Sequence, residues 1–246
     1  MTYGIICAMQ EEFGHLENLI ENAEVRTVYG RDFISGEING NSVVAVVSRI
    51  GKVAAAITTA LLIDKFSVDA IIFCGIAGGL KDEIKVGDIA IGTSCVQHDF
   101  YLADNDIFRI PLLNVTSIPC DNELSKRCIS AAESFAKKAR EQTEICEFYD
   151  SMGIDTPSVH TGVIASGDQF INKPEKKLWL KEKIENAVCC EMEGAAVAQG
   201  CFEAGVPFAI IRVISDSADD NADFSFDKFV GASSLFSQGI IKEFFA

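Results

Sequence analysis

The sequence predicts an α/β protein with three layers, in which helices flank a central, largely parallel but mixed β-sheet. Two observations support this prediction. Short apolar segments alternate with longer helix-like segments along all 246 residues, which is the order of elements found in α/β proteins. The apolar segments are also nearly continuous rather than alternating with polar residues, which is typical of strands buried on both faces of a sheet.

Each predicted strand is a short apolar segment, bounded by glycine or polar residues. The segment SVVAVVS is rich in β-branched valine, which suits a pleated, buried surface, and DAIIFC is followed directly by the glycine-rich GIAGGL. We expect strands at residues 3–9, 42–48, 69–74, 86–96, 158–165, 187–191 and 207–214.

The predicted helices lie between these strands. Gly51 precedes an Ala- and Leu-rich helix, and Asp121 stands where a helix N-cap is expected, because its side chain can accept a hydrogen bond from the first turn. We expect helices at residues 10–22, 52–66, 121–141, 174–185, 192–204 and 226–245. No linker, repeat or low-complexity block interrupts this order, so a single domain spanning 1–246 is expected. Residues 99–118 and 141–157 are the least regular and are expected to leave the core.

The charge of the chain excludes several classes of partner. The sequence has 21 Lys and Arg and 36 Asp and Glu, which gives a net charge of −15. Such a surface repels nucleic-acid phosphates and anionic lipids, so neither a nucleic acid nor a membrane is an expected partner. Neutral, zwitterionic or cationic small molecules suit it better.

The cysteines and the apolar segments indicate a reducing compartment. None of the nine cysteines has C-x-x-C spacing, and several lie inside strand-like segments, where they act as small buried hydrophobes. The first twelve residues lack the basic region of a signal peptide, and no segment approaches the ~20 apolar residues of a membrane helix. We therefore expect a cytoplasmic protein. The three histidines have no metal-ligand spacing, so neither a metal nor a cofactor is expected.

Polar residues follow most of the predicted strands, at the edge where α/β sheets bind ligands. They include carboxylates, a glycine-rich segment and an aromatic residue, in the stretches 10–12, 75–80, 166–170, 191–193 and 215–216. This set predicts a site for a small polar ligand with carboxylates available for acid–base chemistry. Singly, each residue has a simpler interpretation. Glu12 and Glu193 could interact with helix dipoles, GIAGGL could be only a tight turn, and Phe170 could belong to the core.

The ordered set resembles the 5′-methylthioadenosine/S-adenosylhomocysteine nucleosidases, within the wider purine nucleoside phosphorylase family. The resemblance covers most of the chain and implies the nucleoside phosphorylase-like fold. Its motifs are GIICAMQEE near the start, IGKVAAA at 50–56, GIAGGL with KVGDIAIG, SGDQFI at 166–171, EMEGAA at 191–196 and IIRVISDSAD at 210–219.

The resemblance implies hydrolysis of the N-ribosidic bond of methylthioadenosine and adenosylhomocysteine, releasing adenine in methionine salvage. By position, Asp216 resembles the general acid that protonates N7 of adenine. Glu12 resembles the base that activates the attacking water, and Glu193 the carboxylate that binds the ribose hydroxyls. Met192 would pack against the sugar.

Further substrate-binding residues follow from the same resemblance. Phe170 matches the ring that stacks on adenine, and the backbone of Ile171 would contact the purine edge. Gly78 lies in the segment that lines the pocket, Arg212 would help to order the water site, and Ser215 belongs to the same substrate site. The family resemblance and the apolar composition also imply a homodimer.

Two positions and one segment depart from the family pattern. Ile76 stands where the family usually has Ser or Thr, and Arg49 stands where it usually has Gly. Ile76 removes a hydroxyl from the water or ribose site, and Arg49 is expected to bring a cation close to it. Residues 99–113 match no family segment, although this region often completes a neighbouring subunit's pocket in the family.

Two alternatives remain open at this point. A phosphate-using purine nucleoside phosphorylase is disfavoured because Phe73 stands where these enzymes place an arginine, and because a carboxylate at Glu12 repels phosphate. Arg49 favours it. A non-catalytic nucleoside-binding or storage protein of the same fold is disfavoured by the joint presence of Glu12, Glu193 and Asp216.

Overall fold

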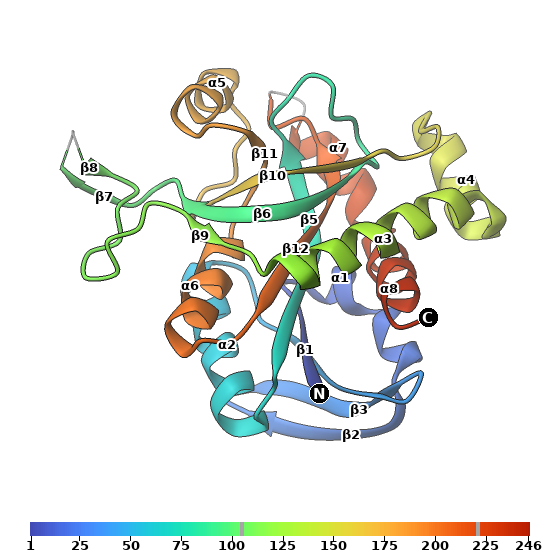
Figure 1. Ribbon diagram of the computed structural model, residues 1–246. Coiled ribbons are helices and arrows are strands. Elements are labelled where there is room, and N and C mark those ends of the chain that lie inside the picture. Colours follow the sequence, from blue (N-terminus) through green and yellow to red (C-terminus); the bar gives the residue numbers. More distant parts are fainter. Residues whose placement is uncertain (104–105, 220–221) are drawn as a thin grey trace.

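The computed structural model describes residues 1–103, 106–219 and 222–246 and has helices on both sides of a central sheet (Figure 1). Within these residues, ten strands form one mixed sheet in the order β11–β10–β6–β12–β5–β1–β4–β3–β2, with β9 paired to β6. The strands of this sheet are β1 (Thr2–Cys7), β2 (Glu21–Val28), β3 (Arg31–Ile38), β4 (Asn41–Val47), β5 (Ala70–Gly79), β6 (Ile89–Gln97), β9 (Ile118–Pro119), β10 (Val159–Ser166), β11 (Ala187–Glu191) and β12 (Phe208–Asp216).

The helices lie in two layers. Helices α2 and α6 pack together on one side of the sheet, and α3 and α8 on the other. The α-helices are α1 (Gln10–Phe13), α2 (Lys52–Phe66), α3 (Asn122–Lys138), α4 (Thr143–Met152), α5 (Pro174–Lys183), α6 (Gly194–Ala204), α7 (Ala222–Val230) and α8 (Ser233–Phe244), and the 3₁₀ helices are η1 (Leu16–Leu19) and η2 (Ala139–Glu141).

The centre of the sheet is parallel. Strand β1 pairs in parallel with β4 and β5, β5 pairs in parallel with β12, and β10 pairs in parallel with β6 and β11. The antiparallel pairs are β6–β12, β2–β3, β3–β4, β5–β11 and β6–β9. The predicted three-layer α/β sandwich with a largely parallel mixed sheet is therefore confirmed.

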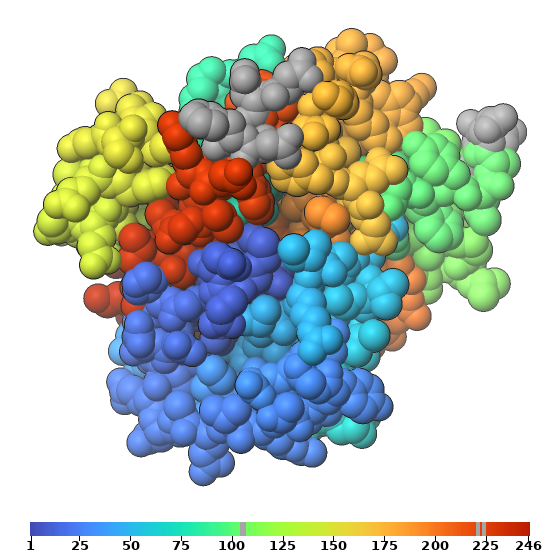
Figure 2. Space-filling model, turned by 180° about the vertical axis from the view of Figure 1, so that it is seen from behind, coloured from blue at the N-terminus to red at the C-terminus, as the bar shows by residue number. Residues whose placement is uncertain are grey.

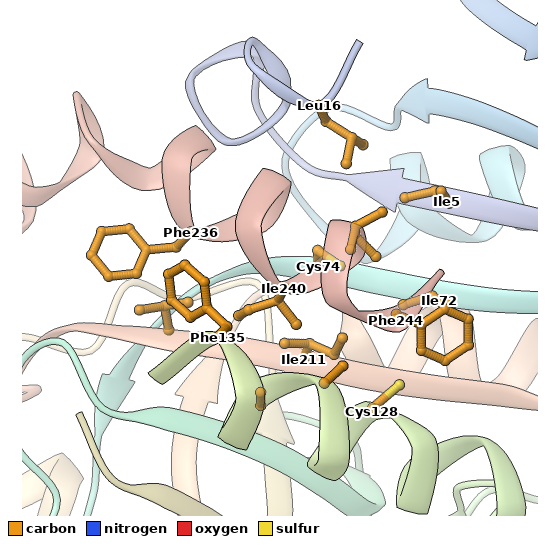
Figure 3. Packing of buried hydrophobic residues seen from close by; sticks show 14 of the residues in the cluster. Ile5, Leu16, Ile72, Cys74, Cys128, Phe135, Ile211, Phe236, Ile240 and Phe244 are labelled. Carbon is orange, nitrogen blue, oxygen red and sulfur yellow. The ribbon is translucent and has the colours of Figure 1, made fainter. Parts of the chain in front are cut away.

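Alternate strand residues pack into two separate cores, because successive side chains of a strand point to opposite faces. On β1, Ile5 joins the core under α3 and α8, whereas Ile6 joins the core under α2 and α6. Figure 3 shows the first of these cores, where Phe135 of α3 and Phe236 of α8 pack beside Ile211 of β12. These two cores hold the strand ends in place around the site described below.

Several element boundaries differ from the sequence expectation. Residues 10–22 were expected to form one helix, but only the short α1 and η1 form, and β2 begins at Glu21. Residues 226–245 form two helices rather than one, with a break between Val230 and Ser233. The glycine-rich segment GIAGGL is not a turn, since β5 continues through Gly79. Asp121 does cap α3, accepting a hydrogen bond from the Leu124 amide at 2.8 Å.

The two segments expected to leave the core behave differently. Strands β7 (Tyr101–Ala103) and β8 (Asp106–Ile107) form a separate hairpin that projects from the sheet (Figure 1), with Leu102 and Leu112 exposed. Residues 141–157 instead contain α4, whose Ile145 and Tyr149 are fully buried. In the described part of the chain, no helix is long and apolar enough to cross a membrane.

Gly239 offers a test of the α3–α8 packing. A Cβ atom at this position of α8 would lie 2.2 Å from Cε2 of Phe135, which is 1% exposed. We expect Gly239→Ala to lower the free energy of unfolding. Overpacking costs about 1–3 kcal/mol, which exceeds the stabilisation of about 0.5–1 kcal/mol that alanine provides over glycine within a helix.

Urea denaturation measures this difference. Gly231→Ala is the control, since a Cβ there meets no atom within 4 Å. An unchanged or higher stability of Gly239→Ala would contradict the described packing.

Candidate active site

A cavity of about 300 Å³ opens at the carboxyl ends of the central strands, which is within the size range of small-molecule sites. Figure 2 shows the face where its lining segments, coloured blue, cyan, orange and red, meet. All of the site residues predicted from the sequence except Arg212 line this cavity, namely Glu12, Gly78, Phe170, Ile171, Met192, Glu193, Ser215 and Asp216.

Glu12 is held by backbone groups alone. Its Oε1 accepts a hydrogen bond from the Ile76 amide at 2.9 Å, and its Oε2 accepts from the amides of Ala8 and Met9 at 2.8 and 3.0 Å. Burial raises the pKa of Glu12, although Arg212 and these amides oppose the shift. The carboxyl group is therefore fixed in one orientation at the cavity wall, with a raised proton affinity.

Glu193 stands at the start of α6 and is also buried. Its Oε1 accepts a hydrogen bond from the Gly51 amide at 2.8 Å, just before the first residue of α2. Burial, and next the negative charge of Glu191, raise the pKa of Glu193 from 4.5 to about 8. The proton affinity of this group is therefore higher than that of an exposed glutamate.

Asp216 lies at the end of β12, beyond an irregularity in the pairing of β12 with β5. Its Oδ1 accepts a hydrogen bond from the Ala218 amide, and its Oδ2 accepts one from the Ser215 hydroxyl, both at 2.8 Å. Burial raises the pKa of Asp216 and outweighs these hydrogen bonds. A Cβ on Gly78 would lie 2.8 Å from Oδ1, so the carboxyl group can pass closely over the backbone of β5 only because residue 78 is glycine.

Arg212 lies beneath the cavity rather than at its wall. Its Nη2 donates a hydrogen bond to Oε2 of Glu191 at 2.5 Å, and both side chains are almost fully buried. The guanidinium also stacks on the Phe73 ring, 3.9 Å from its centroid. The neighbouring carboxylates raise the pKa of Arg212 despite its burial, so one permanent cation is placed under the acidic groups.

Glu191 is a residue to which the sequence reasoning gave no role. Besides Arg212, it accepts hydrogen bonds from the Ser166 hydroxyl and from the amides of Glu193 and Gly194. Glu191 thereby holds the start of α6 and the backbone of Glu193. The EMEG sequence contains both Glu191 and Glu193, but only the fold shows that Glu191 pairs with Arg212, which lies 21 residues further along the chain.

The aromatic residues of the cavity lie at its rim. Phe170 is 42% exposed, and its ring meets the Phe226 ring edge to face at 5.5 Å between centroids. Phe226 was missed by the sequence reasoning, since nothing in its surroundings along the chain distinguishes it from a helix residue of the core. Ile171 and Met192 complete apolar parts of the wall. An exposed aromatic face above buried carboxyl groups suits a ligand with a flat ring and a polar part.

The two departures from the family pattern have different consequences. The Ile76 side chain lines the cavity, but the backbone amide of Ile76 still holds Glu12. Arg49 was expected to bring a cation close to the site, and this expectation is wrong. Its side chain is exposed, and its Nη2 donates to the Gly30 carbonyl at 2.7 Å, so the cation points toward the β2–β3 turn.

The raised pKa of Glu193 predicts a pH-dependent stability. A buried carboxyl that binds its proton more tightly in the folded state stabilises the fold fully below about pH 4.5, and this contribution is lost as the pH rises toward 8. Glu193→Gln removes the ionisable group while keeping an oxygen that can accept from Gly51. We therefore expect its stability relative to the parent protein to increase from pH 5 to pH 8.

Urea denaturation at pH 5, 6.5 and 8 measures this trend. Glu17→Gln is the control, because Glu17 is exposed and its replacement should produce no comparable trend. A stability difference for Glu193→Gln that is constant with pH would refute the assignment.

The chain is similar to known proteins over nearly its whole length. The model of the phosphorylase superfamily matches residues 2–246. A 5′-methylthioadenosine/S-adenosylhomocysteine nucleosidase from Shewanella halifaxensis is 35% identical over 230 residues, covering 94% of this chain and 92% of the relative. The enzyme of the same name from Bacillus thuringiensis subsp. konkukian is 34% identical over 241 residues, covering 98% and 96%.

Solved structures give the same result. The Neisseria meningitidis nucleosidase, in complex with methylthio-immucillin-A, superimposes with a TM-score of 0.86 at 32% identity and covers 99% of this chain and 97% of that chain. The futalosine hydrolase of Helicobacter pylori superimposes with a TM-score of 0.81 at 32% identity, covering 99% and 97%. The chain therefore belongs to the phosphorylase superfamily and, within it, to the family of 5′-methylthioadenosine/S-adenosylhomocysteine nucleosidases.

Proposed function

We propose that the protein hydrolyses the N-ribosidic bond of 5′-methylthioadenosine and S-adenosylhomocysteine, releasing adenine and the corresponding 5-thioribose. The observation that carries this proposal is the convergence of Glu12, Glu193 and Asp216 on one cavity, with Phe170 at its rim. The family membership of the chain supports the same reaction.

Asp216 is the proposed general acid. Adenine is a poor leaving group unless its ring accepts a proton as the bond to C1′ breaks. Burial raises the pKa of Asp216 and favours the protonated form that can make this donation. The Ala218 amide and the Ser215 hydroxyl stabilise the carboxylate that remains after the proton moves to N7. Such proton transfer contributes about 10²–10⁴-fold to the rate.

Glu12 is the proposed base. The attacking water forms a bond to C1′ through its oxygen and gives a proton to Glu12, while the C1′–N9 electron pair leaves with adenine. The three amides hold the Glu12 oxygens and lower the reorganisation needed during the reaction. Arg212, close enough to influence the pKa of Glu12, is proposed to order the same region.

Glu193 and Met192 are proposed to bind the ribose. N-ribosidic bonds break through a transition state with oxocarbenium character, as glycosides do. Carboxyl groups near the sugar stabilise the positive charge that develops there. Phe170 would stack on adenine, the Ile171 backbone would contact the purine edge, and Gly78 and Ser215 would complete the wall beside Asp216.

Water is favoured over phosphate as the nucleophile. Among the described residues that line the cavity, none is Lys, Arg or His, whereas five are Asp or Glu. An acidic site disfavours a phosphate dianion. The one cation that the sequence suggested for this role, Arg49, points away from the cavity. These observations support a hydrolase rather than a phosphorylase.

The assembly and the organisation of the chain remain proposals as well. We propose a cytoplasmic homodimer in which each protomer is a single domain. Exposed apolar side chains on and just before α2, among them Ile50, Val53 and Ile57, support an interface on that side. Ile50 also lines the cavity, so an interface there would lie beside the substrate site.

The substrate assay measures release of the purine base, adenine from methylthioadenosine and adenosylhomocysteine and hypoxanthine from inosine, with and without phosphate. We expect release of adenine from the first two substrates, at rates independent of phosphate. Asp216→Asn should lose about 10²–10⁴-fold in kcat while still binding adenosine.

Asp155→Asn, an exposed position, is the control and should retain activity. Turnover that disappears without phosphate would indicate a phosphorylase. A folded parent protein that binds adenosine but turns over none of these substrates would indicate a nucleoside-binding protein.

Gly75 provides a separate test of the Glu12 geometry. A Cβ atom here would lie 2.6 Å from Oε1 of Glu12 and 2.8 Å from Nη1 of Arg212. We expect Gly75→Ala to displace both groups and to lower kcat by about 10²-fold, the effect of misplacing catalytic groups by about 1 Å.

Steady-state kinetics on methylthioadenosine measures this loss. Gly14→Ala is the matched control, because its Cβ would meet only ordinary contacts of 3.5 Å or more. Full activity of Gly75→Ala would argue against Glu12 as the base.

A further inference from the structure

The N-terminus of α2 holds two carboxyl groups, one from Glu193 on the cavity wall and one from Asp168 in the loop after β10. The Gly51 amide donates to Oε1 of Glu193 at 2.8 Å, and the Lys52 amide donates to Oδ1 of Asp168 at 2.8 Å. Glu193 belongs to the proposed sugar end. Asp168 directly precedes Gln169, Phe170 and Ile171, which line the proposed adenine end. One helix end therefore contacts both halves of the site.

Three residues close a ring of contacts behind this helix end. The Lys52 amide donates to the Asp168 side chain, the Asp168 amide donates to Oδ2 of Asp99 at 2.8 Å, and Oδ1 of Asp99 pairs with Nζ of Lys52 at 2.5 Å. Nζ of Lys52 also donates to Oε1 of Gln97 at 3.1 Å. We refer to these contacts as the Lys52–Asp99–Asp168 ring. It joins α2, the end of β6 and the loop after β10.

The ion pair between Lys52 and Asp99 is partly shielded from solvent, whereas Asp168 is exposed. The side chains of Lys52 and Asp99 are each 16% exposed, so their attraction is less screened than that of a surface pair. Burial by itself would raise the pKa of Asp99, but the hydrogen bonds from Lys52 and the Asp168 amide outweigh it, and the pKa lies below its ordinary value. Asp99 is therefore an ionised partner for Lys52 at neutral pH.

The ring has no direct contact with the reacting atoms. Lys52, Asp99 and Asp168 do not line the cavity that holds Glu12 and Asp216. They act on the backbone of the loop that carries Phe170 and on the helix end that orients Glu193. The turn is also closely packed, since Gly51 has φ +98° and a Cβ there would lie 3.2 Å from Oδ1 of Asp168. Movement of one member therefore displaces the others.

We propose that the Lys52–Asp99–Asp168 ring is a positioning device that sets the adenine-binding loop relative to Glu193. The proposal rests on the function given above, in which Phe170 binds the base and Glu193 the sugar. A nucleoside bridges both ends, so the distance between them decides whether C1′ lies in the reactive position. An error of about 1 Å in such an arrangement costs about 10²-fold in rate.

The test uses Lys52→Met, Asp99→Asn and the double variant in the full-length protein. We measure kcat and KM for methylthioadenosine, the inhibition constant of adenine, and the melting temperature. Each single variant should lower kcat/KM by roughly 10- to 100-fold, with kcat reduced, KM raised and adenine bound more weakly. Because Lys52 and Asp99 act through the same contact, the loss of kcat/KM in the double variant should not exceed the loss in the less active of the two single variants.

Two further variants separate positioning from general stabilisation. Lys52→Arg keeps a cation that can reach Asp99 and should recover most of the activity. Lys138→Met removes an ion pair between α3 and α8, in which Nζ of Lys138 lies 2.7 Å from Oε2 of Glu243, and neither residue lines the cavity. It should lower the melting temperature at most and leave kcat/KM unchanged.

Two results would overturn the proposal. One is a kcat/KM of Lys52→Met within twofold of the parent enzyme, measured below its melting temperature. The other is multiplication of the single losses in the double variant, which would show independent effects. Failure of the proposed function is distinguishable, because the parent protein itself would then release no adenine.

Discussion

The structure depends on how four acidic side chains are kept close together away from water. Glu12, Glu191, Glu193 and Asp216 are all buried, and isolated charges in such surroundings are costly. Arg212 neutralises one of them through its contact with Glu191. The others are accommodated by backbone amides and by raised pKa values, which allow a proton to replace a counterion. The single arginine thus permits an acidic site that carries less charge than its composition suggests.

This arrangement explains where the fold is most constrained. The carboxyl groups of Glu12 and Asp216 approach the backbone so closely that β5 carries glycine beneath them, at positions 75 and 78. The strand that holds these glycines is buried along its whole length. Its neighbour β12 ends at Asp216, and its neighbour β1 is followed by α1, which carries Glu12. The two cores on either side of the sheet therefore support the geometry of the site, since they determine where the strand ends meet.

Much of the fold could be predicted because buried parallel strands leave a strong apolar signal in the sequence. The edge strand β2 and its neighbour β3 were not predicted, and almost every residue of β2 is exposed, in a pattern that resembles that of a loop. Glu12 and Asp216 could be selected because they follow such strands. The partnership of Glu191 with Arg212 and the direction of Arg49 could not be predicted, because side-chain contacts between distant strands and the path of an exposed arginine are set by tertiary structure alone.

The anchoring of the carboxyl groups by amides also affects how the site tolerates mutation. The hydrogen bonds to Glu12 come from the backbone of residues 8, 9 and 76, and Glu193 and Asp216 receive theirs in part from residues 51 and 218. Every amino acid except proline supplies this donor. Side chains at positions 8, 9 and 76 can therefore diverge during evolution, as at Ile76, without loss of the Glu12 anchors, whereas position 51 favours glycine because its φ is +98°. The positions of these carboxyl groups therefore depend on the path of the backbone more than on the side chains that surround them.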